Sequence, residues 1–175
     1  VGETNYKATA QNGVVGLADV LPLGMYGEKE FGVSVTDKKE TYNVTVKALV
    51  VTMTITTADQ YANWITVAKA CEQSATLWGG YFRLGANITA TSMVMFNRGA
   101  TDGSEGFKGV FDGCGYIIDG LNRNSWDSNS FVTTMTGSGI LKNISFTNVK
   151  ITGAGNFLCS GGKGTIENVY VQYVS

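Results

Sequence analysis

The sequence contains no histidine, a single proline (Pro22) and few charged side chains. Without histidine, Ser–His–Asp, Cys–His and HExxH sites are excluded within these 175 residues. Charged residues make up 15% of the chain, against roughly 25% in ordinary globular domains, and the net charge is −1. A nucleic-acid surface needs clustered Lys and Arg, so no nucleic-acid partner is expected.

Long apolar runs are also missing. A helix that crosses a bilayer needs about 20 consecutive apolar residues, so no membrane insertion is expected. Cys71, Cys114 and Cys159 are widely spaced and form no CxxC pair, which disfavours zinc, and no cofactor is expected. The three are expected to be small buried apolar residues, with one disulfide and one leftover thiol as the alternative.

Hydrophobic residues make up 43% of the chain and 23 residues are glycine, which favours many short strands joined by tight turns. Residues 1–52 are predicted to be β-structure. The stretches "EFGVSVTD" and "TYNVTVKALV" alternate apolar and polar residues, as strands with one buried face do, and "TDKKET" between them predicts a hairpin turn. This segment resembles the second half of a bacterial immunoglobulin-like domain.

Residues 58–72 are predicted to form a helix. Apolar residues there follow the i, i+3, i+4, i+7 spacing of one helical stripe: Tyr61, Trp64, Ile65, Ala68 and Cys71. Thr57 and Gln60 have the spacing of a capping box. A domain boundary is expected just before this helix, at about residues 52–57.

Two nearly identical segments, "GILKNISF" at 139–146 and "GTIENVYV" at 164–171, indicate a repeat. The alignment pairs Leu141 with Ile166, Ile144 with Val169, Phe146 with Val171, Val149 with Val174, and Asn143 with Asn168. A further step of 24 residues places "GYIIDGL" on the same pattern, with Gly115 on Gly139, Ile117 on Leu141 and Asp119 on Asn143. Apolar positions at this period, with Asn and Gly at corners, are typical of stacked β-solenoid coils.

The segment "FKGVFDGCGYIIDGL" at 107–121, followed by "GILKNISFTNVKITG", resembles bacterial surface proteins with pectin-lyase-like β-helices. The resemblance covers about residues 55–175 and implies an all-β fold. Residues 53–175 would be the N-terminal part of a right-handed parallel β-helix, with helix 58–72 as its cap, preceded by the partial immunoglobulin-like segment at 1–52. Because Val1 is not a methionine and Ser175 follows directly on a repeat, a piece of a longer protein is expected.

The fold that this resemblance implies also hosts polysaccharide lyases and glycoside hydrolases, and glycoside hydrolysis normally needs two carboxylates at one bond. The nearest pairs are Asp112 with Asp119 and Asp102 with Glu105. Asp112 and Asp119 each precede a glycine, so they are either structural corners or a site. Asp102 and Glu105 lie in a polar loop that is a solvated excursion or, as a weaker alternative, a cation site.

The loop "NRNSWDSNSF" at 122–131 supplies the main binding candidates, namely Trp126, Asp127 and Asn129. Trp126 is either a lid packed on the coil or a platform that stacks on a sugar. Tyr170 and Tyr173 are expected to point outward, if Val169, Val171 and Val174 point inward, and to face solvent, a following segment or a ligand.

The leading hypothesis is a non-catalytic, extracellular module of a bacterial cell-surface or cell-wall protein. It would act as a rigid, adhesin-type spacer with a face for glycans or a host surface, and a monomer is expected. The main alternative is the first coils of a polysaccharide lyase or glycoside hydrolase whose catalytic residues lie beyond this segment. A stalk without any ligand is the third.

Overall fold

A computed structural model describes residues 10–11, 14–15, 21–36, 40–74, 76–90, 105–123, 130–152 and 156–175, with side chains from residue 21 onward. The fold is mostly β, as expected. The elements in chain order are β1 Ala10–Gln11, β2 Val14–Val15, β3 Gly27–Thr36, β4 Thr41–Val50, β5 Met53–Ile55, α1 Ala58–Glu72, β6 Leu77–Trp78, β7 Tyr81–Leu84, β8 Ile88–Thr89, β9 Gly106–Phe107, β10 Val110–Asp112, β11 Ile117–Asp119, β12 Asn122–Arg123, β13 Val132–Met135, β14 Ile140–Ile151, β15 Cys159–Gly162 and β16 Thr165–Tyr173.

Helix α1 confirms the predicted bounds, cap and buried stripe. The Gln60 backbone N–H donates to Thr57 Oγ1 (3.2 Å), and the Thr57 N–H donates to Gln60 Oε1 (3.2 Å), which together form the capping box. Gln73 ends the helix in a left-handed conformation. All five residues of the predicted stripe are buried, so α1 turns one apolar face to the strands and its polar face to solvent.

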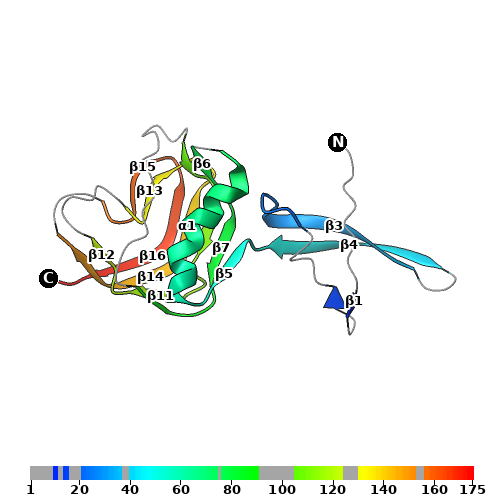
Figure 1. Cartoon of the computed structure of the whole chain (residues 1–175), viewed down its shortest axis with the longest axis horizontal. Coiled ribbons are helices and arrows are strands. Elements are labelled where there is room, and N and C mark those ends of the chain that lie inside the picture. Colours follow the sequence, from blue (N-terminus) through cyan, green and yellow to red (C-terminus); the bar gives the residue numbers. More distant parts are fainter. Residues whose placement is uncertain are drawn as a thin grey trace.

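The strands from β5 onward pair in parallel ladders (Figure 1). One ladder runs β5–β7–β10–β14–β16, a second runs β6–β9–β13–β15, and a third joins β8 and β11 to the later part of β14. Each stretch of chain that adds one strand to each of the first two ladders is called a pass here. The passes are β6–β8, β9–β12, β13–β14 and β15–β16, and each lies directly beside the one before it in the chain.

The predicted register between the last two passes is confirmed for the apolar positions up to residue 146. Leu141 pairs with Ile166, Ile144 with Val169, and Phe146 with Val171. Beyond Phe146 the register shifts, and Val149 pairs with Tyr173 instead of the expected Val174. Asn148 adopts a positive φ of 51° at this point, so the irregular backbone of β14 breaks the even spacing.

The 24-residue step that aligned "GYIIDGL" with residues 139–145 is wrong. Leu141 pairs with Phe111, and it is Phe146 that pairs with Ile118. Between β10 and β11 the chain makes a tight turn, in which the Tyr116 N–H donates to the Gly113 carbonyl (2.8 Å). β14 passes the same place without such a turn, so a constant offset cannot align the two passes.

The core lies between α1 and the ladders. Trp64 is fully buried and contacts four aromatic rings at centroid distances of 4.9–5.9 Å: Phe82, Phe107, Phe111 and Phe131. Phe131 continues the contact to Phe146 (4.8 Å), and Phe146 continues it to Phe157 (5.1 Å). A row of contacting aromatic rings therefore extends from α1 through the interior of the successive passes.

The hairpin β3–β4 forms as predicted, but the expectation of a buried face is wrong. The strands pair antiparallel over ten positions and reach away from α1 and the ladders (Figure 1). Register places Phe31, Val33 and Val35 opposite Val46, Val44 and Tyr42, so these six share one face. Most of this face stays exposed, because no other described strand packs on it; Val44, for example, is 54% exposed.

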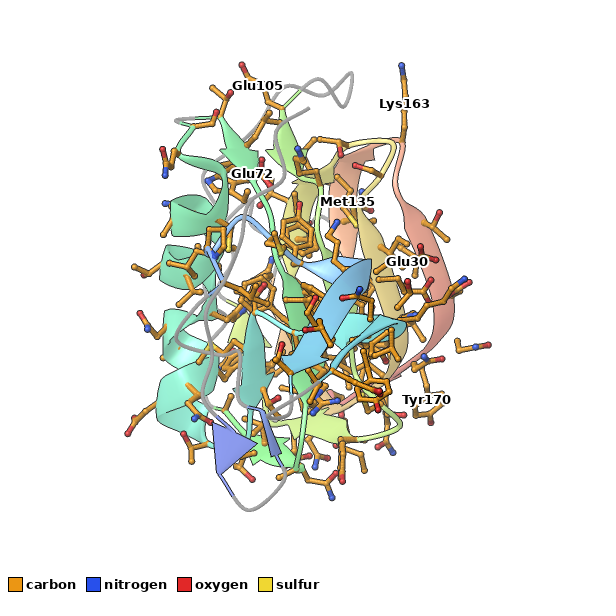
Figure 2. All side chains as sticks on the ribbon, turned by 90° about the vertical axis from the view of Figure 1, so that its right-hand side faces the viewer. Glu30, Glu72, Glu105, Met135, Lys163 and Tyr170 are labelled. Atoms are coloured by element: carbon orange, nitrogen blue, oxygen red, sulfur yellow. The ribbon has the colours of Figure 1, made fainter. Side chains whose placement is uncertain are left out.

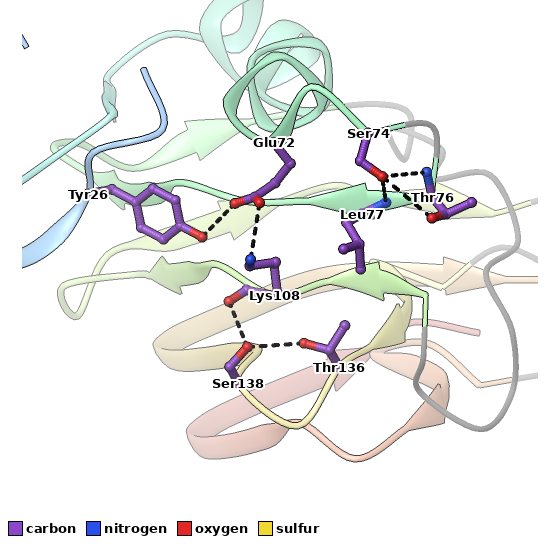
Figure 3. A network of polar contacts seen from close by, with 8 residues as sticks. All are labelled: Tyr26, Glu72, Ser74, Thr76, Leu77, Lys108, Thr136 and Ser138. Atoms are coloured by element: carbon purple, nitrogen blue, oxygen red, sulfur yellow. Dashed lines mark hydrogen bonds and ion pairs between the residues drawn. The ribbon is translucent and has the colours of Figure 1, made fainter. Parts of the chain in front are cut away.

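A polar network ties the segment before the hairpin to α1 and to the second pass (Figure 3). Tyr26 Oη donates to Glu72 Oε1 (2.8 Å), and Lys108 Nζ lies 3.0 Å from Glu72 Oε2. Burial and the bond to Glu72 raise the pKa of Tyr26 to about 12. Gly79 lies beneath this contact, and a side chain there would displace it, since a Cβ would overlap Glu72 Oε1 and lie 2.7 Å from Tyr26 Oη.

Candidate functional site

A column of charged residues crosses the ladder β7–β10–β14–β16. Register places Arg83 beside Asp112, Asp112 beside Lys142, and Lys142 beside Glu167. The signs alternate along the column, so every neighbour has the opposite charge. Neighbouring strands lie about 4.8 Å apart, close enough for each pair to attract.

Asp112 is the centre of this column and is 9% exposed. Tyr81 Oη donates to Asp112 Oδ2 (3.0 Å), the Cys114 N–H donates to Oδ1 (2.9 Å), and Asn143 Nδ2 donates to Oδ1 (3.1 Å). Lys142 Nζ lies 3.6 Å from Oδ2. Burial on its own would raise the pKa of this carboxyl, but the three hydrogen bonds and the lysine outweigh burial and lower it.

The same contacts act on the partners of Asp112. Burial, and then the bond to the carboxylate, raise the pKa of Tyr81 to about 12. Burial, followed by the charge of Asp112, raises the pKa of the Cys114 thiol. Both groups are thus held in their neutral forms at physiological pH, and the carboxylate in its charged form.

Asparagines link the corners of successive passes, at the Asn143–Asn168 pair that the repeat alignment predicted. Asn143 and Asn168 both have a positive φ, of 53° and 52°, which asparagine tolerates better than most residues. Asn168 Nδ2 donates to Asn143 Oδ1 (3.1 Å), while Asn143 donates its own amide to Asp112. Asn143 therefore donates to the pass before it and accepts from the pass after it, and Asn168 donates to the pass before it.

Asp119 takes part in a second link of this kind. Its Oδ1 accepts hydrogen bonds from Thr147 Oγ1 (2.5 Å) and from Asn148 Nδ2 (2.7 Å). Both of the aspartates that precede glycine are therefore bonded to side chains of the next pass. This geometry fits the interpretation of Asp112 and Asp119 as structural corners rather than as a pair that faces one substrate bond.

Tyr170 and Tyr173 lie on different sides of β16. Tyr170 pairs with Ser145 and is 57% exposed, on the side of the molecule away from α1 (Figure 2). Tyr173 occupies the position beside buried Val149, and its ring contacts that of Phe157 at 6.1 Å. Tyr173 is nevertheless 57% exposed, in keeping with the expectation that it faces outward. The register shift after Phe146 places it in the column of Val149, where Val174 was expected.

The other predicted site residues are distributed as follows. Trp126, Asp127, Asn129 and Asp102 lie outside the described residues, and Glu105 is half-buried beside β9. The described residues hold no group of three Cys, Asp or Glu side chains placed for a metal ion. A shallow hollow of about 400 Å³ lies over the hairpin beside Glu30 and Lys47, and none of the candidates that the structure describes lines it.

The cysteines are three free thiols, so the disulfide alternative is wrong. Cys71 is buried, as expected, and Cys159 is half-buried. Cys114 is exposed in the turn after Asp112, with a φ of 51°. Cys114 is exposed because it lies in the tight turn between β10 and β11, away from the interior face. The same turn is the reason why the 24-residue alignment is wrong.

The alternating charge column was not found from the sequence. Its signal is present in the letters, because a charged residue stands after the apolar residue in "FRL", "FDG", "LKN" and "IEN". The correct register between the passes was needed to see that these four positions are neighbours.

None of the helices in the described part of the chain has both the length and the apolar character needed to cross a bilayer. No protein-family model matches the sequence, and no solved structure matches the fold. One curated protein is similar: Halomucin from Haloquadratum walsbyi is 29% identical over 115 residues, which cover 58% of this chain and 1% of Halomucin. The chain thus spans about a hundredth of that relative's length, and its similarity is local.

Proposed function

We propose that this chain is a non-catalytic module of an extracellular surface protein, built from the first windings of a right-handed parallel β-helix. Its passes would form a rigid spacer, and the outer side of β14 and β16 would present a face for glycans or a host surface. The observation that carries the proposal is the bonding of Asp112 and Asp119 between passes. Carboxylates bonded in this way stabilise the stacking of the passes, which supports a structural use of both rather than a pair that flanks one substrate bond.

Three further observations support the proposal. The parallel ladders repeat through four passes with paired corners, as expected of a β-helix. Tyr170 offers an exposed aromatic ring on β16, which suits stacking on a sugar. The similarity to Halomucin, whose name marks it as mucin-like, supports an extracellular setting.

A glycan array probed with the whole chain and with Tyr170→Ala tests the binding part. We expect the unmodified chain to bind a glycan class, and Tyr170→Ala to weaken that binding by about tenfold, as loss of a central aromatic contact does. Tyr42→Ala is the matched control, because Tyr42 is similarly exposed (54%) but lies on the hairpin. Equal binding by both variants would remove Tyr170 as the platform, and Trp126→Ala would then test the other candidate.

An assay on pectic and host glycans tests the non-catalytic part. We expect no new reducing ends and no unsaturated products. Turnover that Asp112→Asn or Asp119→Asn abolishes without unfolding the chain would overturn the proposal and favour the polysaccharide-active enzyme.

A further inference from the structure

The last pass exposes side chains whose counterparts in the pass before it are buried. Leu141 is fully buried, while its partner Ile166 is 42% exposed; Val149 is 1% exposed, while its partner Tyr173 is 57% exposed. Val169 and Val171 are half-buried, although Ile144 and Phe146 beside them are buried. The interior columns therefore continue to β16 and reach solvent there.

The backbone edge of β16 is open in the same place. Within the described residues, β16 pairs with β14 on one side and with no strand on the other. The corresponding edge of β14 is the one that receives β16. An open edge beside exposed apolar side chains is the arrangement to which a further strand adds.

Two features of β16 specify which strand fits. The Asn168 amide nitrogen donates to Asn143, so Asn168 Oδ1 is the acceptor left for a strand on the other side of β16. The residue of that strand opposite Asn168 should therefore carry a hydrogen-bond donor. Glu167 ends the alternating column Arg83–Asp112–Lys142–Glu167, so a basic residue fits beside it. An acidic residue there would repel Glu167.

We propose that the open edge of β16 is a docking edge for a parallel strand from a further pass of the same kind. Opposite residues 166–171 this strand reads apolar, basic, asparagine, apolar, any residue, apolar. The segment "LKNISF" at 141–146 has this pattern and already binds Ile166–Val171 from the other side. A second folded copy of the chain cannot supply that segment, because both edges of its β14 are occupied. The inference does not depend on glycan binding.

An extended chain tests this directly. Residues 151–175 are repeated after Ser175, which places the new strand at the spacing that separates β14 from β16. One version carries Glu167→Lys in the appended copy only, a second keeps the glutamate, and a third combines Glu167→Lys with Asn168→Asp in the appended copy.

We expect amide hydrogen exchange at the original β16 to slow by about tenfold or more in the lysine version, relative to the unextended chain. The version that keeps Glu167 and the version that adds Asn168→Asp should each slow amide exchange at the original β16 by less. The advantage of lysine over glutamate should shrink in 1 M salt, where the screening length falls to about 3 Å.

Two results would overturn the proposal. One is equal exchange at β16 with and without the appended pass, in extended chains that keep the circular dichroism of the original. The other is a concentration-dependent dimer of the unextended chain, measured by sedimentation, that the appended pass abolishes, because a second copy would then be the occupant. Since no readout involves a glycan, failure here leaves the proposed binding face untouched.

Discussion

At the scale of single residues, the geometry of Asp112 explains how an acidic residue can be buried in its charged form. Its carboxylate accepts three hydrogen bonds and lies near one lysine, with donors from three passes. Hydrogen bonds to a charged group contribute about 1.5–3 kcal/mol each. Asp112 therefore stabilises the stacking of its pass on the passes before and after it.

The lowered pKa of Asp112 predicts how Asp112→Asn depends on pH. Because the folded state holds the pKa below its unfolded value of about 3.9, the charge stabilises the fold above that value, and the contribution is lost as the pH falls through the folded pKa. Urea unfolding at pH 7 should show a loss of about 1.5–3 kcal/mol for Asp112→Asn. We expect this difference to narrow as the pH is lowered from 5 toward 3.

Glu28→Gln is the control for that titration, because Glu28 is exposed on the hairpin. At pH 7 we expect its unfolding free energy to lie within about 0.5 kcal/mol of that of the unmodified chain, as for an ordinary surface substitution. A difference for Asp112→Asn that stays constant on acidification would contradict the assigned role of the carboxylate.

At the scale of elements, α1 and the hairpin show opposite relations between pattern and burial. Both are amphipathic in sequence, and both form. The apolar stripe of α1 packs on the aromatic rings of the core, whereas most of the apolar face of β3–β4 is exposed. Periodicity specifies that a face is apolar, but only another element can bury it.

A matched pair of valines tests this difference. Val44→Ala removes methyl groups from the exposed hairpin face, and Val149→Ala removes the same groups from a position that is 1% exposed. We expect the unfolding free energy to fall by less than about 1 kcal/mol for Val44→Ala. The loss for Val149→Ala should be about 2 kcal/mol, since it adds a cavity to the lost burial.

Chemical denaturation of both variants, with the slope of the transition held in common, gives the two values. A loss above about 2 kcal/mol for Val44→Ala would show that the hairpin face is covered in solution.

At the scale of the whole molecule, the passes depend on their neighbours. Each pass places a few apolar side chains inside, and the cost of ordering its backbone exceeds what those side chains can offset alone. Stacking supplies the remaining burial and the parallel hydrogen bonds. The central passes should consequently be the most stable part of the chain.

Hydrogen exchange along the ladder β5–β7–β10–β14–β16 measures this gradient. We expect the slowest amides in β10 and in β14, which have a strand on each side, and faster exchange in β16 and in the hairpin. The difference between β14 and β16 should exceed about tenfold. Uniform protection from β10 to β16 would contradict the open edge.

Local patterns in the sequence determined the helix, its cap and the repeat. Thr57, Gln60 and the stripe from Tyr61 to Cys71 act within one turn or two, so the sequence predicts them without knowledge of the rest. The close match of "GILKNISF" and "GTIENVYV" likewise predicted the pairs from Leu141–Ile166 to Phe146–Val171, because no turn of different length interrupts them.

Only the tertiary structure decided the register of the second pass, the pairing of Tyr173 with Val149 and the contacts of Asp112 and its charged neighbours. Each depends on how many residues lie in a turn or in an irregular part of a strand. One extra residue shifts the pairing between neighbouring strands and moves a side chain to the other face. The sequence also predicted an apolar face on the hairpin, but whether that face is buried depends on what packs against it. Burial and register are properties of contacts between distant segments, so local pattern alone cannot specify them.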